Sequence, residues 1–186
     1  MSDVLAVRDA DRLAELQARG ERMKFVFFWG HREPRSGAAG PGCLSQWWSS
    51  PFTLDGVTYA TAEHYMMAEK ARLFGDGASA AAIVAANHPR HAKDLGRRVR
   101  GFDEATWVEH RFEIVVRGNV AKFSQHRDLG DYLRGTGRRV LVEASPLDRV
   151  WGIGLAADDE RAGDAASWEG LNLLGFALME ARSRLA

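Results

Sequence analysis

The feature that most constrains the fold is a long amphipathic stretch over residues 103–126. Asp103 stands at the position of a helix-capping residue, and the apolar side chains after it recur with the spacing of one helix face. We therefore expect one long helix here, within a largely helical protein. The apolar stripe comprises Trp107, Phe112, Val115, Val116, Val120 and Phe123.

A shorter helix with well-marked ends is expected just before Gly75. Thr61 is a natural N-cap, the helix continues to Phe74, and Gly75 provides the stop. Directly before it, residues 51–59 indicate two short strands joined by a turn at Asp55-Gly56. Further β-rich runs cover 24–29 and 139–144, and further helices are expected over 3–20, 78–86, 90–100, 129–133 and 168–182.

The order of these elements lacks the regular alternation of strand and helix that marks a doubly wound fold. We predict an α+β fold, a predominantly helical single domain with a small β-sheet. Residues 1–23 are expected to form an N-terminal helical extension and residues 24–186 the main domain. Residues 33–42 are rich in glycine and proline, so we expect a loop there and treat it as the candidate mobile segment.

Composition excludes several classes of protein. The 186 residues carry a formal net charge of zero, so no overall field attracts nucleic acid or an anionic membrane. Cys43 is the only cysteine, which rules out an intramolecular disulfide. The N-terminus lacks the apolar segment of a signal peptide, and no apolar run is long enough to span a membrane. We expect a soluble cytoplasmic protein.

The sequence shows no metal-binding pattern. His88 and His91 are three residues apart but flank Pro89, and no histidine pair shares an apolar face with carboxylates. Cys43 has no suitably spaced histidine or asparagine partner, so we interpret it as structural. We therefore predict no metal and no cofactor.

Residues 44–74 mix aromatic rings with titratable groups, as a pocket for a flat polar molecule requires. Glu63 and Lys70 are seven residues apart on the expected helix, which places them on one face about 10 Å apart. Such a carboxylate and amine could act on a sugar, one at the leaving group or water and the other at the anomeric carbon. The plainer interpretation is a glutamate favoured by the helix dipole and a surface lysine.

Aromatic and amide side chains directly before this helix offer binding groups. Ser45, Gln46, Trp47 and Trp48 follow the glycine-rich loop, and indole rings stack well on bases. The alternative is that both tryptophans anchor the loop to the core. We expect one tryptophan in each role.

Two later segments are further candidates. Asp148, Arg149, Trp151 and Gly152 follow the strand at 139–144, and ligand groups often lie on such loops. The alternative there is a turn held by ionic contacts between Asp148 and Arg149. Asn172 lies among leucines and, if buried, must be hydrogen-bonded either to the backbone or to a ligand.

Taken together, these segments closely resemble the NADAR superfamily over residues 24–185. No single string is specific, but the strings occur in the order and at the spacing of that family. They are residues 28–30 (Phe-Trp-Gly), 44–48 (Leu-Ser-Gln-Trp-Trp), 62–71, 121–123 (Ala-Lys-Phe), 141–154 and 168–175.

The resemblance implies a metal-free N-glycosidase or an ADP-ribose-directed hydrolase with a mainly helical fold. It implies Glu63 as the essential acid/base carboxylate and Lys70 as the amine near the sugar, with an imine as one route. Asp148 completes the implied catalytic residues. The implied substrate-binding residues are Trp29, Gly30, Ser45, Trp48, Tyr65, Arg149, Trp151, Gly152 and Asn172.

We therefore expect hydrolysis of the C–N bond between a phosphorylated ribose and an amine on a pyrimidine-like base of the riboflavin pathway. One alternative is removal of ADP-ribose from guanine in nucleic acid, and another is a catalytically idle protein that binds ADP-ribose or NAD. The neutral net charge disfavours a DNA substrate, and the presence of Glu63 and Lys70 disfavours an idle site. The expected partner is a small phosphoribosyl or ADP-ribosyl substrate.

Overall fold

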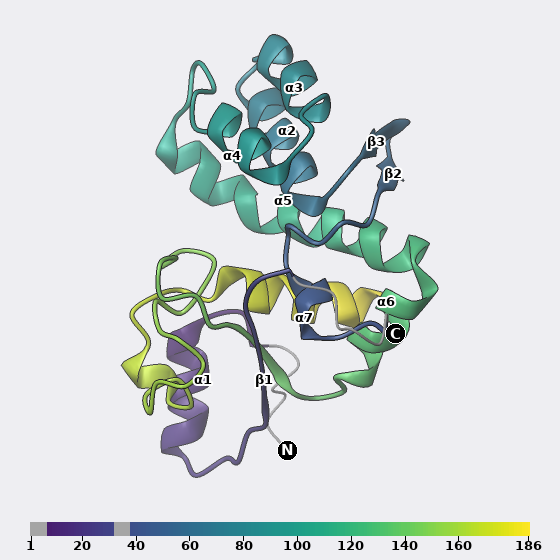
Figure 1. Cartoon of the computed structure of the whole chain (residues 1–186). Helices are drawn as coiled ribbons and strands as arrows, with labels where there is room; N and C mark the ends of the chain where they lie inside the picture. Colours follow the sequence, from purple (N-terminus) through teal and green to yellow (C-terminus); the bar gives the residue numbers. More distant parts are fainter. Residues whose placement is uncertain (1–6, 32–37) are drawn as a thin grey trace. The chain divides into compact units, whose positions relative to one another are not determined.

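The computed structural model describes residues 7–31 and 38–186. The chain forms two compact units, and each is described by itself. The second unit is one continuous segment, Gln46–Arg127, whereas the first combines Met1–Ser45 with Asp128–Ala186. In Figure 1 the second unit therefore appears as an unbroken run of colour from blue to green.

The second unit begins with a hairpin and is otherwise helical. Strands β2 (Phe52–Leu54) and β3 (Val57–Tyr59) pair antiparallel around Asp55 and Gly56. Both turn residues have positive φ, 51° and 76°, as the favoured two-residue hairpin turn requires. The helices are α2 (Ala62–Leu73), α3 (Gly77–Val84), α4 (Pro89–Gly96) and α5 (Glu104–Gln125).

Helix α2 is the centre of the second unit, because α3, α4 and α5 all pack against it (Figure 1). Thr61 begins the helix, and its hydroxyl accepts a hydrogen bond from the backbone N–H of His64. Gly75 follows the last turn with a φ of 70°, a conformation that glycine adopts without strain. The helix buries Glu63 and His64 along with its apolar residues, so two titratable groups lie inside the unit.

The first unit is built around a parallel pair of strands. β1 (Phe25–Phe28) pairs with β4 (Val140–Glu143), and Phe28 stands opposite Glu143. Helix α7 (Leu173–Arg184) packs against β4, and α1 (Ala10–Ala18) packs against the 3₁₀ turn η3 (Ala165–Ser167). The remaining elements are η2 (Pro41–Leu44) and α6 (Arg127–Gly135). The carboxyl ends of β1 and β4 therefore lie side by side.

The closing helix begins later than the predicted start at residue 168. Residues 168–172 instead run beside the loop at 149–153: the N–H of Leu171 donates to Arg149 O at 3.0 Å, and that of Asn172 to Gly152 O at 3.1 Å. Asn172 has a left-handed backbone with a φ of 52°, which cannot continue a right-handed helix. Tertiary pairing here overrides the helical pattern of the sequence.

The α+β class and its predominantly helical character are confirmed, with seven α-helices among the described residues. The small sheet takes the form of two separate two-stranded sheets. The predicted helix over 103–126 corresponds to α5. Residues 1–6 and 32–37, parts of the predicted helix at 3–20 and loop at 33–42, lie outside the described residues. No helix in the described part of the chain is long and apolar enough to cross a membrane.

Candidate functional site

The predicted site residues divide between the two units. Four of them, Trp48, Glu63, Tyr65 and Lys70, belong to the second unit. Within the ranges 7–31 and 38–186, no group of three or more His, Cys, Asp or Glu side chains is placed to hold a metal ion. The first unit holds Trp29, Gly30, Ser45, Asp148, Arg149, Trp151, Gly152 and Asn172.

Glu63 is a buried carboxylate in the first turn of α2, with 3% of its surface exposed. Its backbone N–H donates to Gln46 O at 2.9 Å. The positive end of the helix dipole is a favourable environment for a carboxylate. Since Thr61 already caps the helix, α2 does not depend on Glu63 for its cap.

A chain of buried amides fixes the backbone in front of Glu63. Gln46 Nε2 donates to Asn119 Oδ1 at 3.1 Å, and Asn119 Nδ2 donates to Val115 O at 2.9 Å. Gln46 and Asn119 are both buried. Because the Gln46 carbonyl accepts from the backbone N–H of Glu63, this network ties the start of α2 to α5 and fixes the backbone at Glu63.

His64 is buried beside Glu63 and is held in one neutral form. Its Nε2 lies 3.0 Å from Ala86 O, a carbonyl that can only accept, so Nε2 carries the proton. Its Nδ1 then accepts from the Thr61 hydroxyl at 2.8 Å. Burial lowers the pKa of His64, and the nearby His88 lowers it further, although the bond to Ala86 opposes this. His64 is therefore a structural neighbour of Glu63.

Lys70 is half-buried against two aromatic rings of the same unit. Its Nζ lies 4.1 Å from the ring centroid of Phe102 and 5.5 Å from that of Trp107, distances at which a cation is attracted to the ring face. Burial lowers the pKa of Lys70, and Glu104 partly opposes this effect. The amine is thus held in place and is more readily deprotonated than an ordinary lysine.

The two tryptophans before α2 differ in burial. Trp48 is buried, with 7% exposed, whereas Trp47 is half-buried and meets the His88 ring edge-on at 5.9 Å between centroids. Tyr65 is buried as well. It lies two residues after Glu63 and five before Lys70 on α2, so its side chain points to a different side of the helix.

In the first unit, Asp148 holds a turn through backbone contacts. Its Oδ1 accepts from the N–H groups of Val150 and Trp151 at 2.9 Å and 2.8 Å. The alternative of a turn held by contacts between Asp148 and Arg149 is wrong, because Arg149 pairs with Glu169 at 2.9 Å. The local sequence is nonetheless a turn, since an aspartate commonly bonds backbone groups a few residues ahead.

Gly152 is required by packing between backbone segments. A Cβ at this position would lie 2.8 Å from Glu143 O and 3.0 Å from Asp148 O. The close approach that the glycine allows is therefore to the protein's own strand β4. This packing places the half-buried Trp151 next to the carboxyl end of that strand.

Asn172 is completely buried, and both polar atoms of its side chain form hydrogen bonds with the backbone of β4. Its Nδ2 donates to Leu141 O at 2.9 Å, and its Oδ1 accepts from the Glu143 N–H at 3.0 Å. Of the two alternatives open from the sequence, the structure shows bonds to the backbone. Asn172 joins the start of α7 to the edge strand and orders the loop that carries Trp151.

Trp29 and Gly30 directly follow β1. Trp29 is 61% exposed, an unusual state for so large an aromatic residue, and Leu147 in the loop after β4 is 89% exposed. Because Phe28 and Glu143 are paired, both exposed side chains follow the carboxyl ends of neighbouring parallel strands. Ligands commonly bind at such strand ends. Ser45 is half-buried just after η2.

Sequence reasoning missed the aromatic surroundings of Lys70 and the burial of Lys122. Phe102 and Trp107 lie more than thirty residues from Lys70, so no local pattern links them. Lys122 is completely buried in α5 with Nζ 4.9 Å from the Phe123 ring. Only four lysines occur beside 21 arginines, and that bias is the one signal that could have singled out both amines.

Comparisons with known proteins show the family of the chain. The model of the NADAR domain matches residues 27–186. The chain is 44% identical over 167 residues to N-glycosidase R617 of Acanthamoeba polyphaga mimivirus, covering 87% of this chain and 96% of the relative. It is 38% identical over 140 residues to the riboflavin biosynthesis protein PYRR, chloroplastic, of Zea mays, covering 70% of this chain and 20% of that protein.

The fold likewise has a solved counterpart. The NMR structure of the Escherichia coli protein YbiA matches with a TM-score of 0.69 at 27% identity, covering 89% of this chain and 86% of that one. The chain belongs to the NADAR family. Within this family it is an N-glycosidase, an enzyme that hydrolyses the bond between a sugar carbon and a nitrogen.

Proposed function

We propose that this N-glycosidase cleaves the C–N bond between a phosphorylated ribose and an amine on a pyrimidine-like base, as in intermediates of riboflavin synthesis. The observation that supports this substrate class is the 38% identity to part of the maize protein named for riboflavin biosynthesis. The neutral net charge of the chain is also more typical of an enzyme for small molecules than of one for nucleic acid.

In this proposal Glu63 is the catalytic carboxylate. Cleavage of a ribosyl bond passes through a state with positive charge on the sugar, which a carboxylate stabilises strongly where water is excluded. Glu63 is 3% exposed, and its backbone is fixed by Gln46 and, through Gln46, by Asn119. A buried carboxylate on a fixed backbone is suited to this role.

Lys70 is proposed as the amine that acts at the sugar. It lies seven residues after Glu63 on α2, so the two side chains leave the same face of the helix. The lowered pKa of Lys70 increases the fraction of neutral amine near pH 7, the form that can attack the opened sugar. The rings of Phe102 and Trp107 would hold the amine in place between turnovers.

We also propose substrate-binding roles for residues in the loops that follow β1 and β4, as the resemblance to the family implies. Trp29, with its exposed indole, and Trp151 can stack on a flat base. Asp148 is bonded to the backbone through Oδ1, and its other oxygen is proposed to contact the ribose. We assign Arg149 and Gly30 to binding, and Asn172 to positioning of the loop. We assign Tyr65 no direct contact with the substrate, because it points to a different side of α2 from Glu63.

The test is an assay of released base. Purified protein is incubated with ribosylaminopyrimidine phosphates and, in parallel, with ADP-ribosylated DNA. We expect release of the pyrimidine amine from the first substrate only. Release of ADP-ribose from the DNA, with no reaction of the pyrimidines, would replace this proposal by the nucleic-acid alternative. Tight ADP-ribose binding with no product from either substrate would indicate a sensor.

The role of Lys70 has its own test. Borohydride reduction during turnover should trap a covalent adduct whose mass equals that of protein plus reduced sugar, and the adduct should be absent from Lys70→Ala. Lys93→Ala, on α4, serves as the matched control and should still be trapped. An adduct that persists in Lys70→Ala would exclude the imine at this residue.

A further inference from the structure

Phe102 is an exposed aromatic residue that covers the amine of Lys70. It lies in the loop between α4 and α5, and 42% of its surface is exposed. The Nζ atom of Lys70 lies 4.1 Å from the centroid of its ring. A single exposed apolar residue needs no explanation by itself. What distinguishes Phe102 is the charged group held over the face of its ring.

Two further aromatic residues complete this contact. Phe74, the C-cap of α2, meets the Phe102 ring edge-on, with 5.3 Å between the two centroids. Trp107, near the start of α5, is 7% exposed, and its ring centroid lies 5.5 Å from Lys70 Nζ. A cation is attracted to the face of an aromatic ring within about 6 Å. Phe102 and Trp107 both lie within this range, and Phe74 supports the ring of Phe102.

These rings direct the amine of Lys70 away from Glu63. Phe74 follows the last residue of α2, so the Phe102 ring that packs on it lies near the carboxyl-terminal end of the helix. Glu63 lies in the first turn, about 10 Å from Lys70 along the helix axis. The amine is thus held toward one end of α2 while the carboxylate is at the other. For both groups to act on one sugar, the amine must leave the ring.

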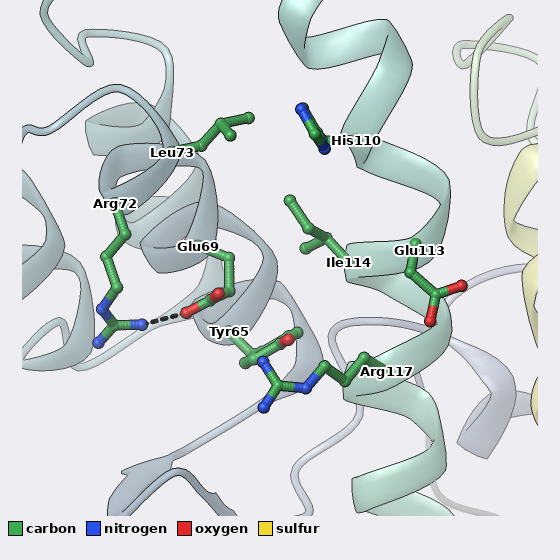
Figure 2. Close-up of a pocket in the computed structure, with 8 residues that line it drawn as sticks. All are labelled: Tyr65, Glu69, Arg72, Leu73, His110, Glu113, Ile114 and Arg117. Carbon is green, nitrogen blue, oxygen red and sulfur yellow. Dashed lines mark hydrogen bonds and ion pairs between the residues drawn. The ribbon is translucent and has the colours of Figure 1, made fainter.

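The charged neighbours of Lys70 on α2 are engaged with each other. Figure 2 shows the ion pair between Glu69 and Arg72, beside the groove between α2 and α5. Successive residues of a helix are rotated by about 100°, so Glu69 leaves α2 on a different side from Lys70. This carboxylate is therefore committed to Arg72, and the amine of Lys70 is held by aromatic rings.

Among the described residues on the elements packed against α2, Glu104 is the one whose charge acts on Lys70. Burial lowers the pKa of Lys70, and the exposed Glu104 at the start of α5 partly opposes this. Helix α3 carries no charged residue, and on α4 Asp94 is paired with Arg97. The other titratable residues on these elements are Tyr59 on β3, Arg90, His91 and Lys93 on α4, and Glu109, His110, Arg111, Glu113, Arg117 and Lys122 on α5.

An aromatic ring attracts the amine only while the amine is charged. The attraction arises from the negative face of the ring, and it disappears when the amine loses its proton. Burial has the opposite effect, because an apolar environment disfavours the charged form. Phe102 therefore contributes both an apolar cover and an attraction for charge. A leucine at this position would retain most of the cover and lose the attraction.

We propose that Phe102 is a positioning residue for Lys70, whose ring holds the charged amine toward the end of α2 and releases it when the amine gives its proton to solvent. The proposal rests on the role proposed above for Lys70 and adds the step that makes its amine available. The neutral amine is the form that can attack the opened sugar. The charge of the amine and its position are thus coupled.

The experiment is an NMR titration of the full chain, isotopically labelled at the Cε atoms of lysine. The sequence has only four lysines, and the Lys70 signal is the one lost in Lys70→Arg. We expect a ring-current displacement of this signal that disappears as the amine loses its proton. Phe102→Leu should remove most of the displacement and lower the titration midpoint of Lys70 by about 0.5 pH unit. Phe102→Trp should retain the displacement and raise the midpoint by a similar amount, because indole attracts cations more strongly.

The opposite signs of these shifts distinguish positioning from packing. Equal midpoints in the wild type and both Phe102 variants, or a displacement that persists in the neutral amine, would overturn the proposal. Val108→Ala, a change at another exposed apolar residue, on α5, is the control and should alter neither midpoint nor displacement. Because Phe102 is partly exposed, both variants should fold, and thermal denaturation checks this.

Borohydride trapping separates this proposal from the proposed function. The rate of trapping in Phe102→Leu should reach half its maximum at a lower pH than in the wild type, and in Phe102→Trp at a higher pH, each by about 0.5 unit. Absence of any adduct in the wild type would overturn the role of Lys70, whatever the titration shows. An adduct in the wild type with the same pH profile in both variants would overturn the role of Phe102 alone.

Discussion

Helices α2 and α7 begin in opposite ways. At the start of α2, Thr61 accepts a bond from the N–H of its own helix at His64, so the first turn is complete within the segment. At the start of α7, the side chain of Asn172 makes no capping bond. Both of its polar atoms instead form hydrogen bonds with the backbone of β4. The start of α2 is therefore fixed by neighbouring residues, and Glu63 is not needed for the cap. The start of α7 is fixed by contacts with a distant strand, and its polar residue, Asn172, holds a loop in place.

The largest expected effect concerns Glu63 at the locally capped start. Glu63→Gln keeps the size of the side chain but removes its charge and its acid/base function, and it should reduce kcat/KM about 10²–10⁴-fold with an unchanged melting temperature. Glu109→Gln, an exposed change on α5, is the control with unchanged activity. Full activity of Glu63→Gln would contradict the catalytic role proposed for Glu63.

Asn172, at the start of α7, should make a large contribution to the free energy of unfolding. Asn172→Ala leaves Leu141 O and the Glu143 N–H without partners and places alanine in a left-handed conformation, so we expect a loss of about 2–5 kcal/mol in the free energy of unfolding. Asn172→Gly relieves the backbone strain and should be less destabilising by about 1 kcal/mol. Urea denaturation measures both, and a loss below about 0.5 kcal/mol for Asn172→Ala would contradict a tertiary role.

The start of α2 should also respond to acid. The pKa of His64 is lowered in the folded protein, so the unfolded chain takes up a proton first as the pH falls below about 6.5. Folding stability contributed by neutral His64 is therefore present above this pH and decreases below it, by at most about 1.4 kcal/mol per pH unit. Denaturation of the wild type and of His64→Gln between pH 7.5 and pH 5 measures how the free energy of unfolding of each depends on pH. An equal dependence on pH in both proteins would contradict this role of His64.

The smallest effect is expected for the cap itself. Thr61→Ala removes the acceptor for the His64 N–H and the partner of His64 Nδ1, and it should cost about 1 kcal/mol of unfolding free energy. Thr61→Ser keeps the hydroxyl and should restore most of that loss. If alanine and serine behave alike in thermal denaturation, local capping is not what defines this helix start.

The same contrast explains which parts of the fold could be predicted. The ends of α2 at Thr61 and Gly75, and the turn at Asp55-Gly56, depend on neighbouring residues, and each was predictable from sequence. The helical spacing of the leucines predicts a start of α7 at residue 168, whereas the helix begins at Leu173. The structure extends these residues beside the loop at 149–153, a contact that no local pattern contains.

The candidate site shows the same division. The face shared by Glu63 and Lys70 follows from helical spacing alone. The catalytic meaning of that face came from the resemblance to a family, and it remains a proposal. The rings around Lys70 come from residues 102 and 107, which lie just before α5 and within it. The environment of a side chain depends on residues that are distant in the sequence, and the spacing of residues within one helix does not predict it.

Only the second unit is one continuous segment, and this has a consequence for synthesis of the chain. All contacts within Gln46–Arg127 become available once that segment has left the ribosome. The pairing of β1 with β4 must wait for residues 140–143, more than a hundred positions after β1. Non-local pairings form late because the intervening chain must first be closed into a loop. We therefore expect the unit that carries Glu63 and Lys70 to fold during translation, with the strand pair of the other unit completed near its end.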